Sequence, residues 1–128
     1  MRAEFLEQLF KIAEIDDRLV FMTADLGFGV VEKFAERFPD RFINVGVAEQ
    51  AMIASATGLA EAGMIPYCYS IATFTSLRAL EFTRNGPIAH RLPVKVVGVG
   101  AGMDYGFDGL THFAIDDVSA LRPYPGFL

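Results

Sequence analysis

The sequence predicts an α/β fold: a doubly wound, mostly parallel sheet with helices on both faces, which makes three layers. Short apolar runs of strand length alternate with segments of helical periodicity along the chain. The run at 19–23 is apolar almost throughout, as expected for a strand that is buried on both faces. The length of 128 residues favours one domain, residues 1–128, which is long enough to bury a core.

Each predicted element has its own signal. Apolar residues at helical spacing indicate a first helix at 3–15, which Asp16 and Asp17 end. A second helix at 30–38 stops at Pro39, and Gly63 suits the C-terminal cap of a third helix at 49–61. Further strands are expected at 41–47, 65–71 and 93–100. Further helices are expected at 74–85, ended by Gly86-Pro87, and at 115–122, after a glycine-rich loop at 101–112.

Composition and charge exclude several classes of protein. The net charge is −5 and the basic residues are scattered, so the sequence indicates no nucleic-acid partner. Acids near the N-terminus argue against a signal peptide, and no apolar run is long enough for a membrane span. The single cysteine, Cys68, lies in an apolar run, where we expect a buried, inert thiol. We therefore expect a soluble, cytoplasmic protein without disulfides.

Candidate site residues follow the predicted strands, because open parallel sheets bind ligands at the carboxyl ends of their strands. The loops after the four strands carry these candidates: Asp25, Glu49, Phe74, Asp108 and His112. No His, Cys and Asp cluster has the spacing of a zinc site, so no metal ligand is assigned. The glycines between 98 and 106 are not followed directly by a helix, so a dinucleotide-binding turn is rejected.

Glu49 stands at the start of a predicted helix that is apolar on nearly every face. By position alone, an acid in the first turn most often complements the helix dipole. A helix as apolar as 49–61 is expected to be buried, and an acid at its head is then partly desolvated. A carboxyl group that can hold a proton beside an apolar pocket is a familiar catalytic device.

The other candidates also have structural interpretations. Asp25 precedes a glycine-bearing loop, where Asp most often forms a turn or a cap. His112 could cap or pack against the last helix, although Asp108 in the same loop favours a site. His90 is expected in a surface loop.

Four segments in this order resemble the pyrimidine-binding domain of transketolase-type thiamine diphosphate enzymes. They are TADLG, RFINVGVAEQAMIASATGLAEAGMIPY, DGLTH and ALRPYPG, and the similarity covers roughly residues 19–126. Transketolase and deoxyxylulose-phosphate synthase both resemble the sequence in this way. The resemblance implies the thiamine diphosphate-binding fold of that domain.

The resemblance also implies roles for particular residues. Glu49 corresponds to the glutamate that hydrogen-bonds a ring nitrogen of the cofactor's aminopyrimidine and drives it toward the imino form, which takes a proton from the thiazolium carbon. Asp25 and Leu26 correspond to a segment beside the cofactor at a dimer interface. Phe74 is the candidate that stacks on the pyrimidine. Arg78 corresponds to an arginine near a cofactor or substrate phosphate in the synthase branch, and an exposed helix charge is the equal alternative.

The loop with Asp108 and His112 corresponds to one that lines the substrate channel and contacts sugar hydroxyls in the family. Leu110 stands where the family usually has Pro, and Phe113 stands where Gln is frequent. These substitutions leave the substrate preference open.

Neither the magnesium-binding motif of the family's diphosphate-binding domain nor its third, C-terminal domain is found. The resemblance therefore implies that this chain holds only the pyrimidine end of thiamine diphosphate, while a partner domain or subunit holds the diphosphate and Mg²⁺. We expect part of a transketolase, which transfers a two-carbon ketol unit between sugar phosphates, and an isolated chain that is inactive. A deoxyxylulose-phosphate synthase, an oxo-acid dehydrogenase β-type subunit and a non-catalytic interaction domain are the alternatives. Homodimers or higher oligomers are expected through the helix at 49–61.

Overall fold

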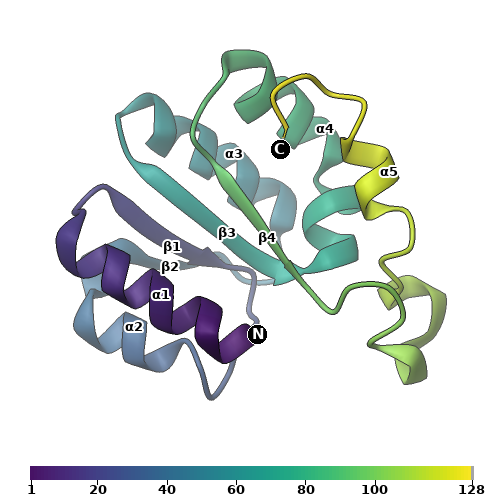
Figure 1. Cartoon of the computed structure of the whole chain (residues 1–128). Coiled ribbons are helices and arrows are strands. Elements are labelled where there is room, and N and C mark those ends of the chain that lie inside the picture. The colour runs from purple at the N-terminus through teal and green to yellow at the C-terminus, as the bar shows by residue number, and fades with distance from the viewer. Residues whose placement is uncertain (128) are drawn as a thin grey trace.

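The computed structural model describes residues 1–127, in which four strands form one parallel sheet (Figure 1). The strands are β1 (Leu19–Thr23), β2 (Phe42–Asn44), β3 (Ile65–Ile71) and β4 (Lys95–Val99), in the spatial order β2-β1-β3-β4. The α-helices are α1 (Arg2–Ile15), α2 (Glu32–Arg37), α3 (Glu49–Glu61), α4 (Leu80–Thr83) and α5 (Asp117–Leu121). Short 3₁₀-helices are η1 (Pro39–Arg41) and η4 (Gly106–His112), and π-helices are η2 (Phe74–Arg78) and η3 (Arg84–Ile88). Among these residues, none of the helices combines the length and apolar character that crossing a bilayer requires.

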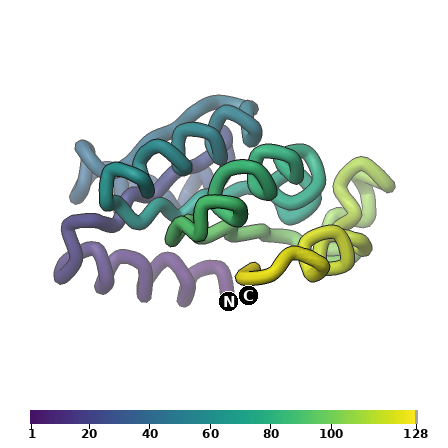
Figure 2. The backbone as a smooth tube through the Cα atoms, turned by 90° about the horizontal axis from the view of Figure 1, so that it is seen from above, coloured from purple at the N-terminus to yellow at the C-terminus, as the bar shows by residue number. Residues whose placement is uncertain are grey.

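Alternating side chains of β1 divide the core into two halves, one on each face of the sheet. Leu19 and Phe21 pack with residues of α1, α2 and β3. Val20 and Met22 pack on the opposite face with residues of α3. Figures 1 and 2 show α1 on one side of the sheet and α3 with α4 on the other. The predicted three-layer α/β fold is confirmed.

The boundaries of several elements agree with the sequence prediction. The strands β1 and β3 and the helix α3 span the predicted residues. Gly63 follows α3 with φ +93°, and its N–H donates to the Ala60 carbonyl, as a C-terminal cap requires. The strand β2 is shorter than the predicted 41–47, because the chain turns at Gly46, where φ is +72°.

The segment 74–85 is helical as predicted, but the prediction that Gly86-Pro87 ends this helix is wrong. The chain forms the π-helix η2, one turn of α4 and the second π-helix η3, which continues across Gly86 and Pro87. Proline has no N–H to give to an α-helical hydrogen bond, and the wider π turn carries the helix past that gap. His90 therefore lies at an exposed helix end and not in a loop.

Helix α3 is buried on one side only, so the expectation of an almost fully buried helix is wrong within this chain. Its buried apolar residues are Met52, Ile53, Ala56 and Ala60. Its exposed small residues are Ala51, Ala54, Ser55 and Gly58. A helix in the outer layer of a three-layer fold covers the sheet with one face, and the other face stays accessible.

Cys68 is fully buried in β3, as predicted. Desolvation raises the pKa of its thiol to about 12. The thiol is therefore protonated at neutral pH, and only the thiolate is a nucleophile.

Gly98 of β4 passes close to the segment that follows β3, and its replacement by alanine is expected to destabilise the chain. A Cβ at this position lies 2.7 Å from Ala72 Cα, which is backbone, and 2.8 Å from Ala72 Cβ. Overpacking of this kind costs about 1–3 kcal/mol of unfolding free energy, which urea denaturation measures.

The matched control for this prediction is Gly58→Ala, because an added Cβ at Gly58 meets no atom within 4 Å. Gly58 lies inside α3, where alanine is favoured over glycine by about 0.5–1 kcal/mol. Replacement of glycine by alanine should therefore lower the unfolding free energy at position 98 and raise it at position 58. Equal or greater stability of Gly98→Ala contradicts the packing argument.

Candidate functional site

The strand order creates a switch point between β1 and β3, the two central neighbours of the sheet. The chain leaves β1 toward β2 on one side and leaves β3 toward β4 on the other. The loops therefore diverge at the carboxyl ends of these strands, which is where open parallel sheets bind ligands.

Glu49, the first residue of α3, lies at this switch point and is 1% exposed. Its Oε1 accepts a hydrogen bond of 2.9 Å from Ser70 Oγ, near the carboxyl end of β3. Its Oε2 accepts a hydrogen bond of 2.7 Å from Arg78 Nη1. A buried carboxylate needs such partners, because its desolvation is otherwise very costly. The predicted buried acid is present, and both of its oxygens are engaged.

Arg78 links Glu49 to a group of aromatic rings. Its guanidinium carbon lies 3.9 Å from the centroid of the Phe74 ring, in cation–π contact. The Phe74 ring meets the His112 ring edge to face at 5.0 Å, and the Tyr105 ring centroid is 5.9 Å from the same imidazole. Side chains from α3, η2 and the region of η4 thus form one continuous group, which we call the Glu49 cluster: Glu49, Arg78, Phe74, His112 and Tyr105.

A second set of contacts ties the loop after β1 to the loop after β2. Asn44 Oδ1 accepts hydrogen bonds from the N–H groups of Asp25 and Gly46, each at 3.0 Å. Asn44 Nδ2 donates to the Asp25 carboxylate at 3.3 Å. Asp25 has φ +54°, a left-handed conformation that Asp tolerates better than most residues. Asp25 therefore forms a turn, and its exposed side chain is held by Asn44 and not by the Glu49 cluster.

Leu26 follows Asp25 in the chain and is half-buried against the core on the α1 side. Thr23 Oγ1 donates to its carbonyl at 2.7 Å and accepts from its N–H at 3.3 Å. These contacts hold the backbone of the turn in place at the end of β1.

The segment with Asp108 and His112 projects from the body of the molecule in both views (Figures 1 and 2). Gly109 breaks its helical geometry with φ +75°. His112 is half-buried, and its Nδ1 is 3.0 Å from Thr111 Oγ1. Asp108 is exposed, and its carbonyl accepts a hydrogen bond from Thr111 Oγ1 at 3.3 Å. The fold brings His112 to the Glu49 cluster, whereas Asp108 lies at the surface of the projecting segment.

Sequence reasoning missed two residues of this region, Ser70 and Asn44. A signal existed for Ser70, because a hydroxyl in a strand expected to be buried must find a hydrogen-bond partner. Asn44 ends a strand just before a glycine turn, where its amide can bridge two backbone N–H groups. The sequence leaves Arg78 either near a phosphate or in solvent; the structure adds an ion pair with Glu49, and the Arg78 side chain is 38% exposed.

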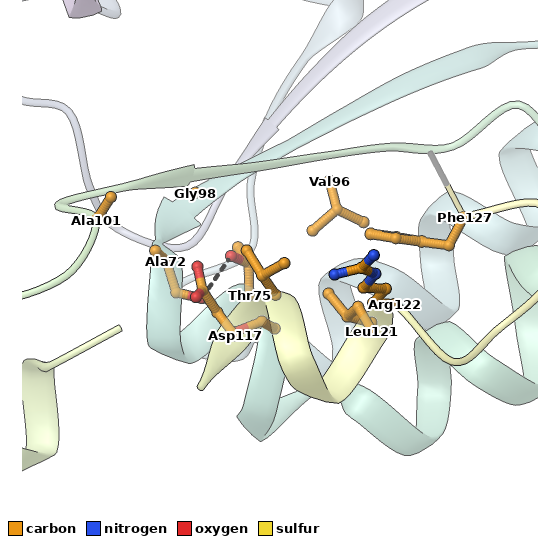
Figure 3. A pocket seen from close by; sticks show the side chains of 11 residues that line it. Ala72, Thr75, Val96, Gly98, Ala101, Asp117, Leu121, Arg122 and Phe127 are labelled. Atoms are coloured by element: carbon orange, nitrogen blue, oxygen red, sulfur yellow. Dashed lines mark hydrogen bonds between the residues drawn. The ribbon is translucent and has the colours of Figure 1, made fainter. Parts of the chain in front are cut away.

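A separate cavity of about 380 Å³ lies between β4, η2 and α5 (Figure 3). Its lining is mainly apolar and includes Val96, Leu121 and Phe127, with Asp117 and Arg122 at the side of α5. Neither Glu49 nor Phe74 nor Arg78 lines this cavity, so it is not part of the Glu49 cluster.

Comparison with known proteins decides the family. The family model described as the transketolase, pyrimidine binding domain matches residues 1–128. This chain belongs to that family. The fold is therefore that of a transketolase pyrimidine-binding domain.

Curated relatives come from several branches of the family. The chain is 40% identical over its whole length to a putative transketolase C-terminal section of Methanocaldococcus jannaschii. It is 38% identical, over 98% of its length, to the 6-deoxy-6-sulfo-D-fructose transketolase subunit of a Clostridium species. It is also 38% identical, over 94% of its length, to 1-deoxy-D-xylulose-5-phosphate synthase of Clostridium perfringens. It spans 41%, 39% and 19% of these three proteins.

Solved structures show the same relationship. A split-gene transketolase, described as an inactive β4 tetramer, superimposes with a TM-score of 0.83 at 34% identity. The match covers 97% of this chain and 40% of that chain. A transketolase of Pichia stipitis in complex with sedoheptulose 7-phosphate has a TM-score of 0.79 at 25% identity, with 96% and 20% coverage.

Proposed function

We propose that this chain supplies the pyrimidine-binding part of a thiamine diphosphate-dependent transketolase, which transfers a two-carbon ketol unit between sugar phosphates. The observation that carries the proposal is the buried carboxylate of Glu49 at the switch point, which Arg78 joins to the ring of Phe74. The similarity to a transketolase C-terminal section supports this branch of the family.

The side chains of the Glu49 cluster fit the ring end of thiamine diphosphate. An aminopyrimidine is a flat heterocycle with nitrogen atoms at its edge, and it needs a hydrogen-bonding partner and an apolar face. Glu49 offers a desolvated carboxyl group, and Phe74 offers an aromatic face within reach of the same guanidinium. Among residues 1–127 no three His, Cys, Asp or Glu side chains are grouped closely enough to hold a metal ion.

The chain's own residues take distinct roles in this proposal. Thiamine diphosphate, when bound, supplies carbanion chemistry. Glu49 holds or shares a proton at the pyrimidine edge, where Ser70 orients its carboxyl group. Phe74 stacks on the ring. His112 and Asp108 line the substrate channel and contact the hydroxyl groups of the sugar phosphate.

Asp25 and Leu26 form the turn that borders the cofactor on the β1 side. We propose that a partner diphosphate-binding domain or subunit holds the diphosphate and Mg²⁺ against this turn. The loops near the carboxyl ends of the strands expose large apolar side chains that suit such an interface: Phe28, Val47, Met103, Phe107 and Leu110. The exposed small residues of α3 would let a second copy approach closely and form a homodimer or a larger assembly.

A deoxyxylulose-phosphate synthase is the second candidate, because a synthase from Clostridium perfringens is 38% identical to this chain. The same Glu49 serves both reactions, so the cluster alone does not separate them. Product analysis separates them, since the synthase releases carbon dioxide and the transketolase does not.

The reconstituted activity tests the proposed function. We expect ketol transfer when this chain is mixed with the diphosphate-binding partner from the same organism, thiamine diphosphate, Mg²⁺, a ketose phosphate donor and an aldose phosphate acceptor. Each chain by itself serves as a control and should be inactive. Tight binding of thiamine diphosphate by this chain without the partner would contradict the division of the cofactor between two domains.

A further inference from the structure

We propose that Arg78 is a built-in placeholder whose guanidinium makes the contacts of the pyrimidine ring while the site holds no ligand, and that ligand entry displaces it. This inference rests on the proposed function and deepens it, because it concerns how the same site admits its ligand. It follows from three features of the Glu49 cluster.

The first feature is that the hydrogen-bond donors to the two carboxylate oxygens of Glu49 differ in their freedom to move. Ser70, which binds Oε1, is 1% exposed and belongs to a central strand, so its hydroxyl has no access to solvent and is fixed in place by the sheet backbone. The side chain of Arg78, which binds Oε2, is 38% exposed and can move into solvent. Oε2 is therefore the oxygen that can pass from an internal partner to a partner on a ligand.

The second feature is the stacking of the guanidinium on Phe74. A guanidinium is a flat group with hydrogen-bonding nitrogens at its edge, and its carbon lies 3.9 Å from the ring centroid. An aminopyrimidine that stacks on this face and bonds Oε2 must fill the same volume. Movement of the Arg78 side chain therefore frees both Glu49 Oε2 and the face of the Phe74 ring.

The third feature is the anchored backbone at Arg78. Arg78 ends the π-helix η2, and the next residue, Ala79, is fully buried in the core on the α3 side. The movement is therefore confined to the long arginine side chain. Any contact of Arg78 with a cofactor or substrate phosphate follows only after the guanidinium has left Glu49.

If the guanidinium and the pyrimidine ring compete for the same contacts, Arg78→Met should lower the stability of the chain and raise its affinity for the ligand. Without ligand, the variant leaves the buried Glu49 carboxylate with Ser70 as its remaining partner, so the chain is less stable. With ligand, the ring meets an open oxygen and an open Phe74 face, so binding is tighter. A residue that only supports the fold would lower both stability and affinity, and a residue that only grips the ligand would lower affinity.

The experiment compares wild type, Arg78→Met and Arg78→Lys in the enzyme assembled with its diphosphate-binding partner. Calorimetry measures the dissociation constants of thiamine, which has no phosphate, and of thiamine diphosphate, while urea denaturation measures the stability of the ligand-free chain. We expect Arg78→Met to bind thiamine about tenfold more tightly and to unfold at lower urea. Arg78→Lys keeps the charge without the flat group and should lie between. The exposed Arg84→Met is the matched control and should change neither quantity.

Weaker or unchanged thiamine binding by Arg78→Met overturns the placeholder. Tighter binding of thiamine with weaker binding of thiamine diphosphate supports it and adds a phosphate contact for Arg78. If the variant does not fold, the side-chain ¹⁵N signal of Arg78 in the wild type decides: it should shift when thiamine binds, and an unchanged signal with thiamine bound overturns the inference. A wild-type assembly that binds neither ligand overturns the proposed function itself, together with the placeholder.

Discussion

Replacement of Glu49 by Gln is expected to lower the rate of ketol transfer in the complete enzyme by about 10²–10⁴-fold. The proposed function gives the Glu49 carboxyl group a proton-sharing role that an amide cannot perform. The fold should survive, because Gln has nearly the same shape and its carbonyl can still accept from Arg78. The Ser70 hydroxyl can turn and accept a hydrogen bond from the new amide nitrogen.

Initial rates of the assembled enzyme measure this effect, and circular dichroism of the chain verifies the fold. Glu61→Gln is the matched control, because Glu61 ends the same helix and its side chain is 56% exposed. The control should keep the wild-type rate. If Glu49→Gln also keeps it, Glu49 acts only as an acid at a helix start, and the catalytic assignment is wrong.

Replacement of Phe21 by Ala is expected to give the largest loss of stability, about 3–5 kcal/mol of unfolding free energy. Phe21 is fully buried in the central strand β1. Its ring centroid lies 5.2 Å from that of Phe34, 5.9 Å from that of Phe42 and 5.7 Å from that of Tyr69. The ring of this β1 residue thus joins α2, β2 and β3, and its removal leaves a cavity among these elements.

Urea denaturation of the chain measures this loss, with Phe28→Ala as the control. Phe28 is 75% exposed in the loop after β1, so its truncation should change the unfolding free energy by no more than about 0.5 kcal/mol. A loss for Phe21→Ala as small as that of the control would mean that the aromatic contacts of β1 do not hold the layers together.

Local patterns were sufficient for the bounds of β1, β3 and α3. The runs of β1 and β3 are apolar and bounded by turns or charges, and the beginning and end of α3 follow from a strand end and a glycine cap. The π-helices η2 and η3 could not be predicted in this way. Their apolar spacing over so few residues does not differ clearly from that of an α-helix.

In the candidate site, too, one residue could be predicted from the sequence and its partners could not. Glu49 was identified from its position after a strand and from the family resemblance, both of which are readable along the chain. Its two partners are not, because Ser70 is 21 residues away and Arg78 is 29 residues away. Only the order of the strands, with β3 beside β1, places these side chains against the head of α3.

The sequence by itself determined the α/β class, the positions of three of the central elements and the acid at the helix start. These properties depend on local periodicity and on residue types within one turn or one strand. The tertiary structure alone decided that α3 keeps an open face, that Arg78 occupies Oε2 of Glu49, and that His112 reaches Phe74 while Asp108 does not. Those contacts join segments far apart in the chain, and they exist only once the sheet has brought its carboxyl ends together.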